Sequence, residues 1–91
     1  HISERGRAVH DTLNGFFDAD GPIPCQIDGG LKCFGHPIGA SGLRMLYEMY
    51  LQFNDRAGER QLPDPRYGLV HNLGGMPFMS ICSVCIVGLA N

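Results

Sequence analysis

The 91-residue sequence predicts an α/β fold, and three observations carry that prediction. Residues 41–53 repeat apolar side chains every three or four positions, as an amphipathic helix does. Residues 67–72 and 78–87 read as strands, the second of them apolar throughout and rich in β-branched side chains. With 44% hydrophobic and 18% charged residues, the chain has enough apolar surface to build a core.

The first third of the chain predicts less regular structure. Residues 2–17 have a weak helical pattern that Gly6 and Gly15 interrupt. Residues 23–27 form a short extended run between turn-forming residues, and we expect a short strand there. Residues 31–42 are rich in glycine and predict a tight loop that leads into the central helix.

The central helix over residues 41–53 is the best-defined element. Its apolar side is formed by Leu43, Leu46, Met49, Tyr50 and Phe53. Arg44 and Glu48 are spaced four apart on the other side, where they can form an ion pair. Residues 54–65 are polar and contain two prolines, so the helix ends before them. Residues 73–77, with two glycines and a proline, then predict a loop between the two strands.

Composition excludes several classes of protein. The net charge of −2 lacks the basic footprint of a nucleic-acid binder, and no apolar run approaches the ~20 residues of a membrane span. Four cysteines are too few for a disulfide scaffold, which favours a reducing, cytoplasmic setting. Cys82 and Cys85 are three apart in a strand and point to opposite faces, so they cannot share a metal ion. We therefore expect no metal site and read all four cysteines as core residues.

The segment GHPIGASG, residues 35–42 (the GHP segment), is the sharpest local motif. A rigid turn of glycine and proline holds His36 just ahead of a helix, whose first N–H groups favour developing negative charge. Small residues at the helix start allow close packing against a backbone or a ligand. The same pattern is also typical of a capped turn with a structural histidine, and spacing alone does not separate the two.

The second motif is HNLGG, residues 71–75. It places His71 at the predicted tip of a strand beside a glycine turn, the usual position for chemistry in layered α/β folds. A polar residue that merely closes a strand is the competing interpretation. Two histidines, each next to a glycine turn, favour an acid/base or oxyanion site.

Taken in order, DGGLKCFGHPIGASG, an amphipathic helix, LVHNLGG and an apolar strand closely resemble the C-terminal end of thiolases, from about Gly21 to Gly88. The resemblance implies the C-terminal part of a layered αβαβα fold, with a mixed sheet and covering helices. Residues 1–91 would then be the C-terminal portion of a thiolase C-terminal domain. The nucleophilic cysteine of thiolases lies in the N-terminal half, and nothing in this chain matches its motif.

The resemblance also assigns roles to residues. His36 would activate the nucleophilic thiol and bind the thioester oxygen that becomes negative, with His71 as a supporting catalytic group. The substrate and oxyanion contacts would come from Asn72, Leu73, Gly74 and Gly75. The loop near coenzyme A would contain Gly35, Pro37, Gly39 and Ser41. Many thiolases carry a Cys-x-Gly motif at the position of His71–Asn72. The His-Asn pair of this chain resembles instead the sterol-carrier-protein-type and archaeal branches.

The implied function is that of an acetyl-CoA acetyltransferase-like acyltransferase, which cleaves 3-ketoacyl-CoA thiolytically or runs the reverse Claisen condensation. Coenzyme A or acyl-CoA is the substrate, and no cofactor is covalently bound. Implied partners are the remainder of the subunit, a second copy in a homodimer or tetramer, and a small zinc-binding OB-fold protein as in related archaeal and bacterial thiolases. Two alternatives stay open: a thiolase-fold retro-aldol lyase, and a non-catalytic subunit for assembly or coenzyme A binding. By itself the chain is expected to be inactive.

Overall fold

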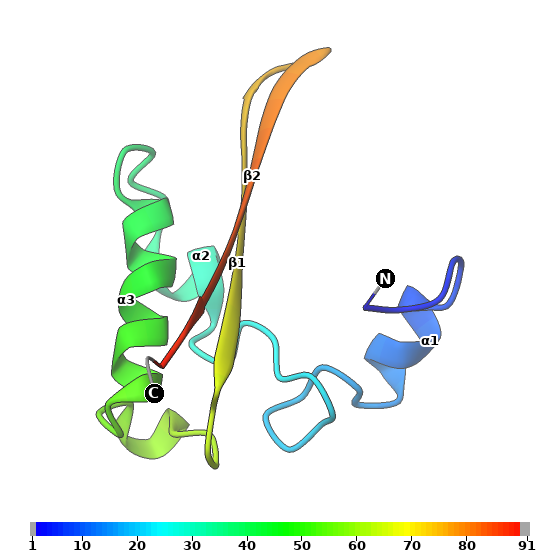
Figure 1. Ribbon diagram of the computed structural model, residues 1–91. Helices are drawn as coiled ribbons and strands as arrows, with labels where there is room; N and C mark the ends of the chain where they lie inside the picture. Colours follow the sequence, from blue (N-terminus) through cyan, green and yellow to red (C-terminus); the bar gives the residue numbers. More distant parts are fainter. Residues whose placement is uncertain (1, 90–91) are drawn as a thin grey trace. The chain divides into compact units, whose positions relative to one another are not determined.

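The computed structural model describes residues 2–89 and divides into two compact units, residues 1–35 and 36–91 (Figure 1). The first unit contains α1 (Ala8–Leu13) and α2 (Gly30–Phe34). The predicted helix over residues 2–17 is therefore shorter than expected. Gly6 and Gly15 flank α1 with φ of 84° and 75°, a left-handed conformation that no helix continues through.

The strand predicted at residues 23–27 is wrong. This segment is irregular and is held by two hydrogen bonds to the preceding turn, from Ile23 N–H to Phe16 C=O and from Cys25 N–H to Phe17 C=O. Gln26 has a φ of 50°, which breaks an extended run. The short helix α2, which the sequence did not predict, follows at once.

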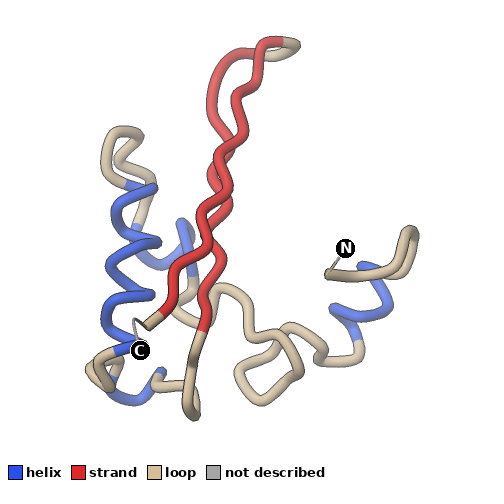
Figure 2. The backbone as a smooth tube through the Cα atoms, viewed as in Figure 1, coloured by secondary structure: helices blue, strands red, loops and turns tan. Residues whose placement is uncertain are grey.

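The second unit carries the remaining elements: α3 (Ser41–Phe53), the 3₁₀ turn η1 (Gly58–Arg60), β1 (Tyr67–Met76) and β2 (Met79–Gly88). Figure 2 shows the two strands as one long hairpin. The helix predicted over residues 41–53 is confirmed at both ends. The α/β class is confirmed as well, with a helix packed on a two-stranded antiparallel sheet.

The hairpin is longer than predicted, because residues 73–76 are not a loop. They continue β1, and the turn consists of Pro77 and Phe78 alone. Proline sets its own φ near −65° and Phe78 takes a φ of 67°, so two residues reverse the chain between the paired residues Met76 and Met79.

One face of the hairpin packs on α3. Val70 on this face is buried, and a side chain added at Gly68 would collide with Met49 of α3. Since side chains alternate along a strand, residues 69, 71 and 73 point the other way, and their partners in β2 point with them. That opposite face is formed by Leu69, His71, Leu73, Cys82, Val84 and Ile86.

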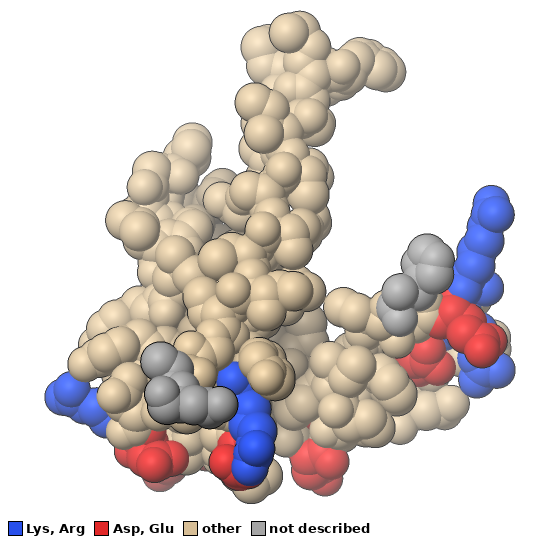
Figure 3. Space-filling model, in the orientation of Figure 1, with Lys and Arg blue, Asp and Glu red and all other residues tan. Residues whose placement is uncertain are grey.

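This opposite face is exposed in the part of the chain that the structure describes. Leu73 is 63% exposed and Ile86 68% exposed within residues 2–89. Figure 3 shows the hairpin without a lysine, arginine, aspartate or glutamate, as its sequence requires. An uncharged sheet face with this many large apolar side chains is a surface for packing rather than for solvent.

The other side of α3 is held by a polar network. Glu48 and Gln52 are almost completely buried, because the segment after the helix folds back over them. Glu48 forms an ion pair with Arg60 at 3.1 Å, and the predicted pair with Arg44 is longer, at 4.0 Å. This network fixes the chain segment that leads from α3 to β1.

Candidate active site

His36 is held at the start of α3 by its neighbour Ser41. The Nδ1 atom of His36 lies 2.8 Å from Ser41 Oγ, and Ser41 Oγ donates a hydrogen bond to the carbonyl oxygen of Pro37 at 3.2 Å. The same carbonyl accepts the backbone N–H groups of Ala40 and Ser41 at 2.8 and 3.0 Å. The GHP segment is therefore a closed turn that orients the imidazole, as its sequence predicted.

Asn72 on β1 approaches the same helix end. A Cβ atom added at Gly42 would lie 3.0 Å from Asn72 Nδ2, so the small residue at this position lets the strand side chain come close. Asn72 is half-buried and shares its face with Val70, which packs on α3. The close neighbour of Gly42 is thus a side chain, and not the backbone or ligand that the sequence predicted.

His71 lies elsewhere, and its predicted position at a strand tip is wrong. It is in the middle of β1, paired with Val84, and its side chain points to the face opposite α3. Its Nε2 atom lies 3.0 Å from Cys82 Sγ. The structure therefore does not bring His71 toward the GHP segment, because a shift of one position along a strand reverses the side-chain direction.

The contact between His71 and Cys82 is a feature that sequence reasoning missed. Cys82 pairs with Leu73 across the hairpin, which places it diagonal to His71 on the same face. Cys85 pairs with Val70 and points to the other face, as the three-residue spacing predicted. All four cysteines are exposed within residues 2–89, so their predicted burial is wrong there.

The remaining residues of the HNLGG motif are part of the ladder rather than of a turn. Leu73, Gly74 and Gly75 pair with Cys82, Ile81 and Ser80. Gly75 has a φ of 108°, and a Cβ atom there would collide with the backbone of Met79. Only glycine can occupy that position without distorting β2.

The loop predicted to lie near coenzyme A is exposed. Gly35 follows α2 with a φ of 74°, and Pro37 and Gly39 are accessible in the turn before α3. Ser41 differs from them, because it is only 4% exposed. Arg44 is the one basic residue between positions 36 and 53, and it faces Glu48.

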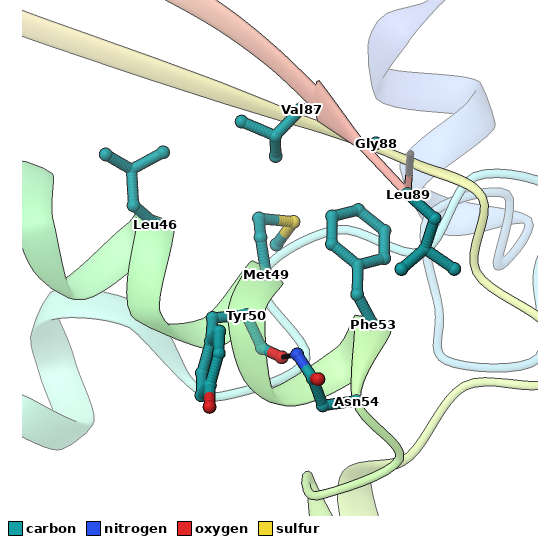
Figure 4. A pocket seen from close by; sticks show the side chains of 8 residues that line it. All are labelled: Leu46, Met49, Tyr50, Phe53, Asn54, Val87, Gly88 and Leu89. Atoms are coloured by element: carbon teal, nitrogen blue, oxygen red, sulfur yellow. Dashed lines mark hydrogen bonds between the residues drawn. The ribbon is translucent and has the colours of Figure 1, made fainter. Parts of the chain in front are cut away.

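One pocket of this unit is separate from His36. It has a volume of about 360 Å³ and lies between the C-terminal half of α3 and the end of β2 (Figure 4). Its lining is mostly apolar: Leu46, Met49, Tyr50, Phe53, Asn54, Val87, Gly88 and Leu89. Ser41 and Phe53 are twelve residues apart, about 18 Å along a helix axis, so the pocket is at the other end of α3.

Within residues 2–89 no three side chains of the metal-binding types gather closely enough to hold an ion. None of the helices in the same range has the length and apolar character needed to cross a bilayer.

Comparison with known proteins gives a consistent family. Residues 1–88 match the thiolase C-terminal domain-like family. An acetyl-CoA acetyltransferase of Methanothermobacter thermautotrophicus is 43% identical over 72 residues, which cover 79% of this chain and 18% of the relative. An acetyl-CoA acetyltransferase of Methanocaldococcus jannaschii is 36% identical over 75 residues, covering 79% of this chain and 19% of the relative.

Sterol carrier protein 2 of Homo sapiens is 48% identical over 46 residues, which cover 50% of this chain and 8% of that protein. The chain thus spans no more than 19% of the length of any of these three relatives. No solved structure matches the chain.

Proposed function

The chain belongs to the thiolase family as a C-terminal segment, and from that premise we propose that it supplies the histidine side of an acyl-CoA acyltransferase site. The observation that carries this proposal is the His36–Ser41–Pro37 arrangement at the start of α3. It holds an imidazole in one orientation while leaving the residue exposed. Relatives named acetyl-CoA acetyltransferase support coenzyme A thioesters as the substrate class.

In this proposal a cysteine thiol from the rest of the subunit is the nucleophile. The free ring nitrogen of His36 takes the thiol proton, and the thiolate adds to the 3-keto carbon of the substrate. The bond between C2 and C3 then breaks, C2 takes a proton from a second cysteine of the complete subunit as acetyl-CoA leaves, and the acyl group stays on the nucleophilic sulfur. The second cysteine, now a thiolate, takes the thiol proton of a second coenzyme A, whose sulfur displaces the acyl group. The nucleophilic cysteine leaves as a thiolate and takes back the proton that His36 holds.

His36 has a second task once it is protonated. Its N–H can donate to the carbonyl oxygen that becomes negative during each addition. An oriented donor of this kind is worth several kcal/mol in a site that excludes water, because it stabilises charge that exists only in the transition state.

We propose that Asn72, rather than His71, is the polar side chain that β1 contributes. The contact of Asn72 with the start of α3 supports this assignment, and the bond from His71 to Cys82 on the other face argues against a direct role for His71. An amide at Asn72 can hold a substrate carbonyl or a water close to His36. Those backbone N–H groups of residues 73–75 that do not bond to β2 would add oxyanion contacts.

The proposal extends to the setting of the chain. The exposed apolar face of the hairpin supports packing against the remainder of a longer subunit. We further propose a cytoplasmic homodimer or tetramer, with a small zinc-binding OB-fold protein as a candidate partner. These assignments follow the family resemblance.

The test uses the full-length gene product that carries this segment. We expect thiolysis of acetoacetyl-CoA by coenzyme A and a trapped acyl-enzyme in the intact mass. His36→Ala should lower turnover by ~10²–10³-fold, because one oxyanion donor and one base are lost. His10→Ala, an exposed histidine of α1, is the matched control and should have no effect.

Near-normal thiolysis by a folded His36→Ala variant would exclude the proposed role of the GHP segment. Coenzyme A binding without acyl-enzyme formation would indicate a non-catalytic subunit. Cleavage of a carbon–carbon bond without an acyl-enzyme would indicate a retro-aldol lyase.

A further inference from the structure

The hairpin extends past the start of α3, at the end of the helix where the GHP segment lies. β1 and α3 run in opposite directions. Gly68 lies against Met49 in the second half of the helix, whereas Asn72 lies against Gly42 near its start. Four further residues of β1 follow Asn72, and at ~3.3 Å per residue they carry the hairpin about 13 Å beyond this contact. Figure 1 shows both strands continuing past the helix.

Beyond the helix, the side of the hairpin that faces α3 is apolar. Side chains alternate along each strand, so the face that holds Asn72 continues through two more cross-strand pairs to the turn. These four residues, the distal surface, are Gly74, Met76, Met79 and Ile81. Ile81 is 75% exposed and Met79 76% exposed, and neither strand contains a charged residue. Nothing within residues 2–89 lies within 4 Å of a Cβ atom placed at Gly74, so there is open space opposite Ile81.

We infer that the distal surface binds the acyl chain of the thioester substrate and favours 3-ketoacyl groups with an apolar chain of several carbons over acetoacetyl. This inference rests on the proposed acyl-transfer function and deepens it by naming the substrate class. In that function the reacting carbons lie close to His36 and Asn72. A chain that leaves the 3-keto carbon along the direction of β1 meets the distal surface next.

The chemistry of the distal surface suits a hydrocarbon chain. Ile81 offers a branched apolar side chain, and Met79 a flexible, polarizable one that adapts to chains of different shape. Gly74 lets a chain lie close to the backbone of β1, because it has no side chain. An acetoacetyl group ends at the methyl group next to its 3-keto carbon and is too short to use these contacts.

The opposite face of the hairpin is also apolar, but it points away from Asn72 and therefore from the reacting carbons. This difference provides a matched control. Ile86 on the opposite face is 68% exposed and Ile81 on the distal surface is 75% exposed, and both belong to β2. The same replacement at the two positions therefore separates the effect of the face from the effect of the substitution.

The experiment uses the full-length gene product and two thioesters, acetoacetyl-CoA and 3-ketooctanoyl-CoA. The quantity measured is the chain-length ratio, which is kcat/KM for thiolysis of 3-ketooctanoyl-CoA divided by kcat/KM for thiolysis of acetoacetyl-CoA. Ile81→Thr removes apolar surface and keeps a β-branched side chain that suits a strand. Ile86→Thr is the control, and Met79→Gln is a second variant that keeps the length of the side chain but makes it polar.

We expect the wild type to prefer 3-ketooctanoyl-CoA. Ile81→Thr should lower the chain-length ratio by about tenfold, the smaller effect of one methylene group in an apolar site. Met79→Gln should lower the ratio as well, and it gives the answer if Ile81→Thr fails to fold. Ile86→Thr should leave the ratio unchanged.

The inference is overturned if the wild type prefers acetoacetyl-CoA, or if folded Ile81→Thr keeps the wild-type ratio. A lower melting temperature with an unchanged ratio would show that another part of the subunit, and not the acyl chain, covers the distal surface. Absence of thiolysis with both thioesters would instead refute the proposed function. The dissociation constants of the two thioesters then decide: tighter binding of the longer one that is lost in Ile81→Thr would support the inference, and equal binding would overturn it.

Discussion

Replacing Gln52 by alanine should loosen the segment that follows α3. The side chain of Gln52 is 2% exposed and connects the helix to this segment in both directions. Its Nε2 donates to the carbonyl oxygen of Arg60 at 2.9 Å, and its Oε1 accepts the N–H of Leu62 at 2.9 Å. A further bond from Nε2 to Glu48 Oε1, at 3.2 Å, fixes the amide on the helix.

The cost follows from the groups that Gln52→Ala leaves unpaired. The Leu62 N–H and the Arg60 carbonyl both lose a partner in a partly buried place. An unsatisfied buried group costs about 1–3 kcal/mol, and partial access to water lowers this toward the smaller figure. We therefore expect about 2–4 kcal/mol for the local opening of residues 57–62, or roughly 30- to 1000-fold faster exchange at about 1.4 kcal/mol per factor of ten.

Native-state hydrogen exchange of the Leu62 amide in the full-length gene product measures this directly. Asn54→Ala is the matched control at the C-terminal cap of α3, because Asn54 is exposed and its side chain makes one hydrogen bond, to Tyr50 C=O at 2.7 Å. The control should leave Leu62 exchange unchanged. Equal exchange in the Gln52→Ala variant and the wild type would refute the claim that this side chain holds the segment.

Three further outcomes are expected. Asn72→Ala should lower the rate of thiolysis by about tenfold more than His71→Asn does, because catalytic contributions of ~10²–10⁴ belong to groups that face the site. A larger loss of kcat in His71→Asn would contradict the assignment of Asn72, and not His71, to the face that packs on α3. Joint replacement of Cys82 and Cys85 by alanine should lower the melting temperature and leave turnover per folded molecule unchanged; stoichiometric zinc in the wild type, lost in the variant, would argue otherwise. The isolated 91-residue chain should show no cooperative thermal transition and should self-associate in size-exclusion chromatography, because its hairpin exposes an apolar face and unpaired edges; a monomer with a sharp transition would disprove this.

The central helix could be predicted from sequence because its signals are local. A three- and four-residue apolar period, small residues before Ser41 and a polar run after Phe53 set its limits, and the structure has the same limits. The burial of two side chains on its polar side could not be predicted in the same way. Burial of Glu48 and Gln52 depends on a chain segment eight to twelve residues away, through bonds that periodicity does not contain.

The length of the hairpin was underestimated for a related reason. Two glycines and a proline in residues 73–77 are typical of a loop, and each has a low strand propensity. In the structure Gly74 and Gly75 stay in the ladder, because cross-strand pairing with β2 outweighs local preference and Pro77–Phe78 suffices for the turn. Pairing between strands is a long-range effect, so local composition misplaced the strand end and, with it, His71.

The choice between His71 and Asn72 shows how a single residue decides which side chain reaches the site. Residues 68, 70 and 72 share one face of β1, and residues 69, 71 and 73 share the other. Hydrophobicity favours burying the second set, which contains two leucines, and so would direct His71 toward the helix. The structure turns the first set inward, because the missing side chain at Gly68 makes room for Met49 and lets α3 approach the sheet closely. Packing against a glycine, rather than the count of apolar side chains, therefore determines that Asn72 meets the start of α3 while His71 meets Cys82.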